Sequence, residues 1–267
     1  METQSQVDLG LTGTVVLVTG GARGVGAGIT RTLVGLGAVP VICGRSPDNV
    51  VADLRDVEFV ACDVRDDAAV EAMIRQIADE HGRIDGVVNN AGGSPFVPAA
   101  DASARFTGKI VELNLLAPMI VARHANAVMQ TQADGGAIVN VSSVSGHRPS
   151  PGTSAYGAAK AGLDNLMSSL AVEWAPRVRV NSVVAGPVET EQSHLHYGDA
   201  DGVAAVGATI PMGRMATPAD IGNAVSFLLS PLAGYVTGST LTVHGGGEKP
   251  AFLDAATVNN ETVGTAS

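Results

Sequence analysis

"TVVLVTGGARGVG", residues 14–26, begins with an apolar, β-branched run and passes directly into a glycine-rich turn. The run is typical of a buried strand. A glycine-rich turn between a strand and a helix lets the N–H groups at the start of the helix approach a pyrophosphate closely. Gly20, Gly24 and Gly26 form GxxxGxG, which differs from the GxGxxG pattern of the general dinucleotide motif. By itself the turn fits either a nucleotide site or a tight connection.

Further short apolar runs recur along the chain, separated by segments long enough for a helix. Their polarity is continuous and does not alternate, as expected of parallel strands that are covered on both faces. The sequence therefore predicts an α/β fold, a single-domain, Rossmann-type, doubly wound parallel seven-stranded sheet with helices on both faces. The predicted strands are residues 14–18, 39–43, 57–61, 84–88, 136–141, 178–183 and 240–243.

The predicted helices have recognisable ends. Residues 66–82 open with acidic side chains, repeat apolar residues at helical spacing and stop at Gly82. Further helices are predicted for residues 103–130, 154–174 and 217–230, whereas residues 188–212 lack a clear period. No composition change or repeat marks a second domain. We expect one Rossmann-fold domain over residues 1–247 and a polar tail over residues 248–267.

Composition and charge exclude several classes of partner. The 267-residue chain has a formal net charge of −10 and only three lysines, so we expect neither nucleic acid nor an anionic membrane as a partner. The amino terminus, METQSQVDLG, lacks a basic start followed by an apolar segment, and no apolar run is long enough to span a bilayer. A cytoplasmic protein is expected. Cys43 and Cys62 each end an apolar run and are predicted to be buried free thiols.

The end of the second predicted strand indicates which nucleotide would bind. NAD enzymes usually place a carboxylate there, where it binds the ribose hydroxyls. This chain has Gly44 and Arg45 instead. A guanidinium can pair with a 2′-phosphate, which a carboxylate would repel, and Arg23 in the glycine turn adds a second positive charge. These residues favour NADP(H) over NAD(H); the alternative interpretation is that Arg45 is a solvated loop residue.

A tyrosine and a lysine stand four residues apart in SAYGAAK, residues 154–160, so they share one face of the predicted helix. The ammonium of Lys160 would favour the phenolate of Tyr156. Moving a phenol pKa from ~10 to ~7 requires roughly 4 kcal/mol, more than one exposed pair supplies. A buried site with a second positive charge, such as an oxidised nicotinamide, could supply it. Ser143, at the end of the fifth predicted strand, could donate a hydrogen bond to a substrate oxygen.

Taken together, these motifs resemble the short-chain dehydrogenase/reductase family over about residues 12–247. The family's Thr-Gly-x-x-x-Gly-x-Gly turn is matched from Thr19 to Gly26, and its Asn-Asn-Ala-Gly segment by residues 89–92. The resemblance implies a four-residue catalytic set: Asn114, Ser143, Tyr156 and Lys160.

The resemblance also implies a mechanism. Hydride passes between nicotinamide C4 and a carbonyl carbon, Tyr156 exchanges the proton and Ser143 polarises the oxygen. Lys160 holds the nicotinamide ribose and, with Asn114 and a water, relays protons to solvent. The predicted cofactor-binding residues, Arg23 and Arg45 included, are Thr19, Gly20, Arg23, Gly24, Val25, Gly26, Arg45, Asp63, Val64, Asn90, Ala91, Gly92, Tyr156, Lys160, Gly186, Val188 and Thr190.

One segment departs from the family pattern. The family usually has Pro-Gly after the sixth strand, whereas this chain has Ala185 before Gly186 and a proline displaced to Pro187. The resemblance assigns the following loop, with Val188 and Thr190, to nicotinamide contacts. The sequence leaves the backbone path of this loop open.

Three histidines and one serine suggest other chemistry. His194 and His196 have i, i+2 spacing, but no third ligand is evident, so we predict no metal. His147 could line the substrate pocket or be a plain loop residue. No GxSxG surrounds Ser143, so a hydrolase nucleophile is not expected.

The leading hypothesis is an NADP-dependent oxidoreductase acting on a small-molecule ketone or secondary alcohol. A non-catalytic nucleotide-binding sensor is one alternative, although a sensor need not keep the whole catalytic set. A 3-oxoacyl-carrier-protein reductase is another, although an acidic carrier would want basic patches. The family resemblance further suggests a homotetramer built on the helices that contain Asn114 and Tyr156. Specificity is expected in residues 93–101, 145–153 and 188–212.

Overall fold

The computed structural model describes residues 8–257, in which seven parallel strands form one sheet in the order β3-β2-β1-β4-β5-β6-β7. The predicted fold class is confirmed. The chain reverses direction across the sheet between β1 and β4, which is where ligands bind in open α/β folds, outside the carboxyl ends of the strands. The strands are β1 Val15–Thr19, β2 Val39–Gly44, β3 Glu58–Ala61, β4 Gly86–Asn89, β5 Gly136–Ser143, β6 Val178–Ala185 and β7 Thr240–Val243.

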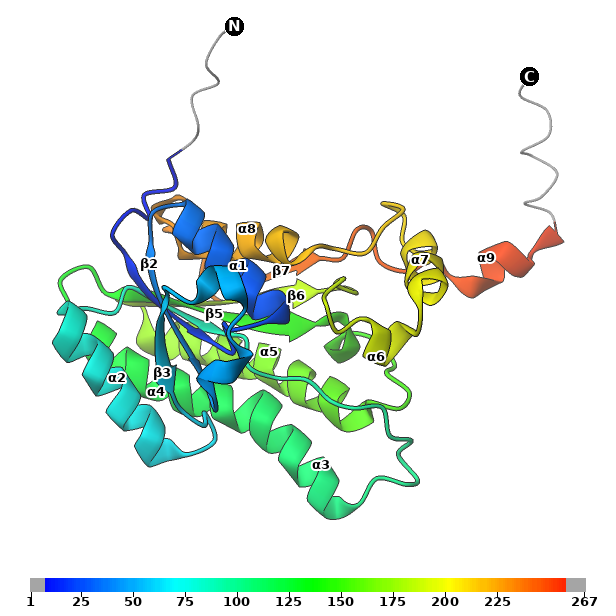
Figure 1. Ribbon diagram of the computed structural model, residues 1–267, viewed down its shortest axis with the longest axis horizontal. Helices are drawn as coiled ribbons and strands as arrows, with labels where there is room; N and C mark the ends of the chain where they lie inside the picture. Colours follow the sequence, from blue (N-terminus) through cyan, green and yellow to red (C-terminus); the bar gives the residue numbers. More distant parts are fainter. Residues whose placement is uncertain (1–7, 258–267) are drawn as a thin grey trace, which may run out of the picture.

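Helices cover both faces of the sheet (Figure 1). On one face lie α1 (Gly24–Gly35) and α8 (Pro218–Leu229). On the other lie α2 (Asp67–His81), α4 (Ala117–Met129) and α5 (Ser154–Trp174). Successive residues of β1 therefore enter opposite cores, Val16 and Val18 under α1 and α8, Val15 and Leu17 under α2 and α4. This two-sided burial explains the continuous apolar runs in the sequence.

The pair α1 and α8 packs at very short range. A Cβ at Gly28 of α1 would lie 2.1 Å from the Cβ of Pro218, which begins α8. Thr217 caps α8, and its side chain accepts a hydrogen bond from the N–H of Asp220. The absence of a side chain at Gly28 thus fixes how closely α8 covers the first strand and its turn.

The helix predicted over residues 103–130 is interrupted. It consists of α3 (Ala104–Val111), a π-helical turn η3 (Glu112–Leu116) and α4. Single π-helical turns inside helices often occur at functional sites. This one carries Asn114, whose side chain is fully buried.

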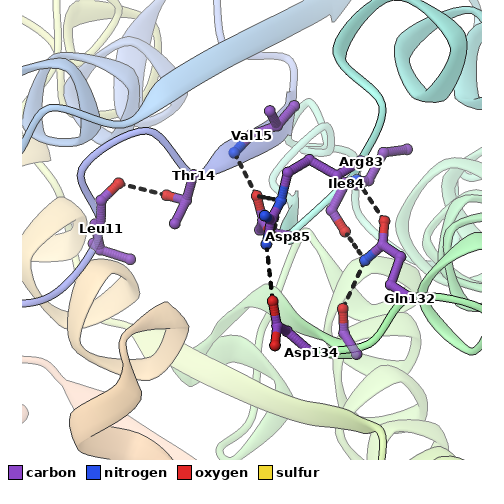
Figure 2. Close-up of polar contacts among 9 residues, drawn as sticks. Leu11, Thr14, Val15, Arg83, Ile84, Asp85, Gln132 and Asp134 are labelled. Carbon is purple, nitrogen blue, oxygen red and sulfur yellow. Dashed lines mark hydrogen bonds and ion pairs between the residues drawn. The ribbon is translucent and has the colours of Figure 1, made fainter.

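A polar network lies at the amino-terminal ends of β1 and β4, opposite the strand ends that could bind a ligand (Figure 2). The carboxylate of Asp85 accepts hydrogen bonds from the N–H of Val15 at 2.8 Å and from Nε of Arg83 at 2.8 Å. The side chain of Gln132 accepts a hydrogen bond from the N–H of Ile84 at 2.8 Å and donates one to the carbonyl of Ile84 at 2.9 Å. These bonds satisfy backbone groups that begin β1 and β4.

The aperiodic segment 188–212 forms two short helices, α6 (His194–Tyr197) and α7 (Ala200–Thr209), at one end of the molecule (Figure 1). The start of the predicted tail forms α9 (Ala251–Ala255), and residues 258–267 lie outside the described part of the chain. None of the helices within residues 8–257 is long and apolar enough to cross a bilayer. Short 3-10 turns lie at η1 Pro47–Asn49, η2 Ala52–Leu54, η4 Val144–Gly146 and η5 Pro231–Ala233.

Candidate active site

A cavity of about 750 Å³ lies at the carboxyl ends of the strands. It brings together most of the predicted site residues from distant parts of the chain. Thr19 and Asn114 are the predicted residues that do not line it; both are buried and act on residues that do. The predicted residues that line it are Gly20, Arg23, Gly24, Val25, Gly26, Arg45, Asp63, Val64, Asn90, Ala91, Gly92, Ser143, Tyr156, Lys160, Gly186, Val188 and Thr190.

The glycine turn has a shape that side chains could not adopt. Gly20 and Gly24 have φ angles of +64° and +55°, in the left-handed region that favours glycine. A Cβ at Gly26 would lie 2.1 Å from the carbonyl oxygen of Gly20. The turn therefore presents bare backbone to the cavity. The N–H of Gly24, the first residue of α1, is bonded to Oε1 of Glu191 at 2.9 Å.

Thr19 and Asn90 join the ends of β1 and β4. The Thr19 hydroxyl accepts hydrogen bonds from the N–H groups of Asn90 and Ala91, both at 3.0 Å. The Asn90 amide in turn donates to the carbonyls of Thr19 at 3.0 Å and Gly20 at 3.2 Å. These four hydrogen bonds hold the glycine turn against the Asn-Asn-Ala-Gly segment.

Asn114 also holds backbone in place at the cavity, in this case the loop after β4. Its Oδ1 accepts from the N–H of Gly93 at 2.8 Å, and its Nδ2 donates to the carbonyls of Gly93 at 3.0 Å and Ile110 at 2.9 Å. Ile110 lies four residues earlier in the same interrupted helix. The π-helical turn thus directs the Asn114 amide at the backbone of the loop after β4.

Tyr156 and Lys160 lie on the same face of α5, as the spacing predicts. The Nζ atom of Lys160 is 5.6 Å from the centre of the Tyr156 ring and donates to the carbonyl of Val141 at 2.7 Å. Burial lowers the pKa of Lys160 to about 8, and the Asp164 carboxylate opposes this change. Burial raises the pKa of Tyr156, the Ser143 hydroxyl acts in the opposite direction, and Tyr197 adds to the rise. In the protein alone, Tyr156 is therefore a neutral phenol at pH 7.

His147 lies outside the cavity lining and contacts Asp164 instead. Its Nε2 is 2.9 Å from Oδ2 of Asp164, which also accepts a hydrogen bond from Ser142 at 2.7 Å. The other oxygen, Oδ1, is buried without a hydrogen-bond partner. Asp164 is one helical turn beyond Lys160, so this buried carboxylate supports the ammonium electrostatically.

Guanidinium groups gather at the end of the cavity formed by β2 and β3. Arg23 and Arg45 are exposed and form no ion pair with any residue in the described part of the chain. A third guanidinium, Arg65, also lines this end and binds both oxygens of Asp63. That hydrogen bond is the main cause that lowers the pKa of Asp63 to about 2, and Arg45 contributes. The carboxylate is thus already neutralised.

The loop after β6 is fixed by an isolated parallel β-bridge. Val188 bridges to Ala216, whose N–H donates to the carbonyl of Pro187 at 3.0 Å. The N–H of Glu189 donates to the carbonyl of Ala216 at 2.8 Å. These backbone bonds define the path that the departure at Ala185 left open, and they keep Val188 and Thr190 at the cavity.

The remaining candidate residues are two cysteines, two histidines and a cluster of possible metal ligands. Both cysteines are buried free thiols, as predicted, and burial raises the pKa of Cys43 to about 12. His196 lines the cavity, and His194 does not. Within residues 8–257, the group of side chains close enough to share a metal ion is Glu58, Glu80 and His81, none of which lines the cavity.

This lining fits a nicotinamide dinucleotide. Bare glycine backbone and guanidinium groups suit phosphates, and the buried Lys160 ammonium suits ribose hydroxyls. Sequence reasoning missed Arg65, Arg148, Glu191 and Tyr197. The spacing of Arg65 to Asp63 could have suggested an ion pair, whereas the positions of the others depend on how loops far apart in the sequence meet.

The comparisons with known proteins agree with this geometry. A family model described as enoyl-(acyl carrier protein) reductase matches residues 20–248. A cis-4-hydroxycyclohexanecarboxylate dehydrogenase of Sinomonas cyclohexanicum is 38% identical over 87% of this chain and 95% of its own length. A 3-oxoacyl-[acyl-carrier-protein] reductase of Vibrio harveyi is 36% identical over 89% of this chain and 98% of its own. The chain belongs to the short-chain dehydrogenase/reductase family, which consists of oxidoreductases that use nicotinamide cofactors.

Solved structures show the same fold. The ligand-free aldohexose dehydrogenase of Thermoplasma acidophilum superposes with a TM-score of 0.84, at 30% identity, over 90% of this chain and 96% of that one. The relatives named above act on hydroxyl or oxo groups of chemically different molecules.

Proposed function

We propose that the protein is an NADP-dependent oxidoreductase that interconverts a small-molecule ketone and a secondary alcohol, with Tyr156 as the general acid–base. The observation that carries this proposal is the convergence of Ser143, Tyr156 and Lys160 on one cavity with a buried ammonium 5.6 Å from the phenol ring. Glycine backbone that could hold phosphates lines the same cavity. A non-catalytic sensor would not require a buried lysine beside a tyrosine.

The protein's residues handle the proton. When bound, NADP(H) supplies or accepts the hydride. In reduction, Ser143 donates a hydrogen bond to the carbonyl oxygen and Tyr156 transfers its phenolic proton to that oxygen. Burial keeps Tyr156 protonated and therefore ready to donate. Lys160, with a pKa of about 8, is mostly charged at pH 7 and stabilises the phenolate that remains.

Asn114 and Lys160 would restore that proton from solvent. Lys160 is within reach of Tyr156 on α5, and Asn114 holds the Gly93 backbone next to it. A Cβ at Gly92 would lie 2.6 Å from Asn114 Oδ1 and 3.5 Å from Lys160 Nζ, so both groups meet at this glycine. We assign Asn114 to the proton relay on this basis.

The preference for NADP(H) is supported by the charges at the β2 end of the cavity. Arg23 and Arg45 have no carboxylate partner within the described chain, and Asp63 is already bound by Arg65. A 2′-phosphate could pair with these free guanidinium groups bidentately.

Two experiments test the proposal. Fluorescence titration with NADPH and NADH should show tighter binding of NADPH, and equal or tighter NADH binding would refute the cofactor assignment. Turnover should then be measured on a panel of ketones and secondary alcohols. The variant Tyr156→Phe should bind NADPH normally and lose turnover by about 10²–10⁴-fold, the contribution typical of general acid–base catalysis.

A 3-oxoacyl-carrier-protein reductase remains the second candidate, because the family description and the Vibrio relative point to carrier-bound substrates. The chain has only three lysines, and an acidic carrier would require a basic docking surface. Comparing a free 3-oxo thioester with the same group on the carrier protein distinguishes the two functions.

We also propose a homotetramer built through η3, α4 and α5. These elements expose the apolar side chains of Leu116, Met119 and Val172, the last 81% exposed. The cytoplasmic location and the division into a catalytic domain of residues 1–247 and a tail stay predictions from the sequence.

A further inference from the structure

The half of the cavity beyond the catalytic tyrosine contains an unexpected charge. We define this substrate half by its lining residues within 94–96, 143–156 and 192–197. Most are small, hydroxylated or aromatic, such as Ser94, Phe96 and Ser145. Arg148 is the fixed cation among the described lining residues of this half, and none of them is a carboxylate. A substrate carboxylate would therefore meet one cation and no like charge in this half.

Arg148 is held by a carboxylate from the far end of the chain. Its Nη2 donates to Oε1 of Glu248, and its Nη1 donates to the carbonyl of Pro149 at 3.1 Å. Glu248 follows the glycine turn after β7, and its side chain and that of Arg148 are each 40% exposed. An ion pair this exposed contributes little to stability. The guanidinium therefore already binds one carboxylate and could exchange it for another.

Tyr197 connects this ion pair with the catalytic residue. Arg148 lowers and Glu248 raises the pKa of Tyr197, whose net shift is upward because of burial. Tyr197 itself raises the pKa of Tyr156. Tyr197, Tyr156 and Arg148 line the same cavity, so the Arg148–Glu248 pair and the reacting phenol belong to one site. Glu248 reaches this half of the cavity only through its bond to Arg148.

We infer that the substrate carries a carboxylate at the end remote from its reacting carbon, and that Arg148 binds this carboxylate in place of Glu248. The inference rests on the proposed oxidoreductase function and names its substrate class: small oxo acids and the matching hydroxy acids. A planar guanidinium matches a carboxylate with two parallel hydrogen bonds. Glu248 occupies the guanidinium when no acid is bound, so a substrate carboxylate must displace it and binds more weakly than it would to a free guanidinium.

The test compares acids with their neutral esters. The oxo acids 4-oxopentanoate, 5-oxohexanoate and 4-oxocyclohexanecarboxylate are each measured against the methyl ester with NADPH. The wild-type protein should prefer the best acid, by kcat/KM. Arg148→Gln should reduce the acid-to-ester ratio by about 10- to 100-fold, mainly through KM, because a charge-assisted hydrogen bond is lost. Glu248→Gln should lower KM for the acids several-fold, because the competitor is removed.

Lys249→Gln serves as the matched control, because Lys249 is an exposed cation next to Glu248 and does not line the cavity. It should leave the acid-to-ester ratio unchanged. An ester preference in the wild type, or an Arg148→Gln ratio equal to that of the wild type, would overturn the inference.

Binding of the oxo acids to the NADPH-loaded protein, measured by thermal shift, separates this inference from the proposed reaction. Arg148-dependent binding of an oxo acid without turnover would keep the carboxylate site and refute the reaction. Turnover of esters with no preference for acids would keep the reaction and refute the site. If no oxo acid shows Arg148-dependent binding, the carboxylate site is wrong.

Discussion

Oε1 of Glu191 accepts a hydrogen bond from the N–H of Gly24 at 2.9 Å. Gly24 begins α1, so this carboxylate occupies the helix N-terminus that the sequence assigns to a pyrophosphate. The contact joins residues 167 positions apart. We therefore expect a pyrophosphate that binds at this terminus to displace Glu191, because the two anions repel each other.

The first prediction concerns this displacement. Glu191→Gln should lower the Kd for NADPH by about 3- to 10-fold, because an anion at a helix N-terminus is stabilised by roughly 1 kcal/mol and the variant competes less strongly. Fluorescence titration measures the change. The neighbouring Glu189→Gln is the matched control, because Glu189 is an exposed carboxylate of the same loop and the Gly24 N–H is bonded to Glu191 instead. An equal effect of both variants would show that only net charge matters.

The second prediction concerns the 2′-phosphate. Arg45→Ala should raise the Kd for NADPH by about 10- to 100-fold and leave that for NADH nearly unchanged, because the guanidinium has a charged partner only in the phosphorylated cofactor. Arg55→Ala, an exposed arginine outside the cavity, should change neither. Equal losses for both cofactors would assign Arg45 a general structural role.

The third prediction concerns the stability cost of Lys160. Its pKa is lowered from 10.5 to about 8, so the folded protein binds this proton more weakly than the unfolded chain. The resulting penalty is full below pH 8 and is relieved as the pH rises from about 8 to 10.5. Lys160→Met should therefore raise the free energy of unfolding at pH 7 by about 1–3 kcal/mol, after allowing for the lost bond to Val141.

Urea unfolding of the cofactor-free protein at pH 7 and pH 10 measures this effect, and the gain should be smaller at pH 10. Lys109→Met, on the exposed face of α3, is the control and should change stability by less than about 0.5 kcal/mol. The variant at Lys160 should lose turnover despite its greater stability. A Lys160→Met protein less stable than the wild type would show that the interactions of the ammonium outweigh the cost of burying it.

The fourth prediction concerns the network in Figure 2. Asp85→Ala should lower the free energy of unfolding by about 1–3 kcal/mol, because it leaves the Val15 N–H without its partner. Asp134→Ala is the control, since Asp134 is 80% exposed and lies 3.5 Å from Arg83. NADPH affinity at low temperature should be unaffected in both. Loss of binding in Asp85→Ala would mean that the two ends of β1 are coupled.

The fifth prediction concerns assembly. Val172→Asp should yield particles smaller than a tetramer in light scattering, because it places a charge on the exposed apolar face of α5. Val34→Asp, at a half-exposed position on α1, should keep the wild-type mass. A tetramer in both variants would place the interface elsewhere.

The sequence alone predicted the sheet and its parallel strands, and all the predicted site residues except Thr19 and Asn114 line the cavity. These features depend on local patterns: the apolar run at residues 14–18, the glycines after it, and the four-residue spacing of Tyr156 and Lys160. The predicted helix over residues 103–130 was less accurate, because a π-helical turn has no periodic signature. Within this turn, Asn114 bonds to Gly93, a contact between segments that local spacing does not reveal.

Three features were decided by the tertiary structure. Burial, and not the neighbouring charge, dominates the pKa changes of Tyr156 and Lys160, and burial depends on the whole fold. Thr19 and Asn114 are held inside the walls of the cavity, where their side chains bind backbone. Glu191 reaches Gly24, and Glu248 reaches Arg148, across contacts between segments far apart in the chain. Local spacing determines which residues share a face; only folding determines what that face meets and how much water remains there.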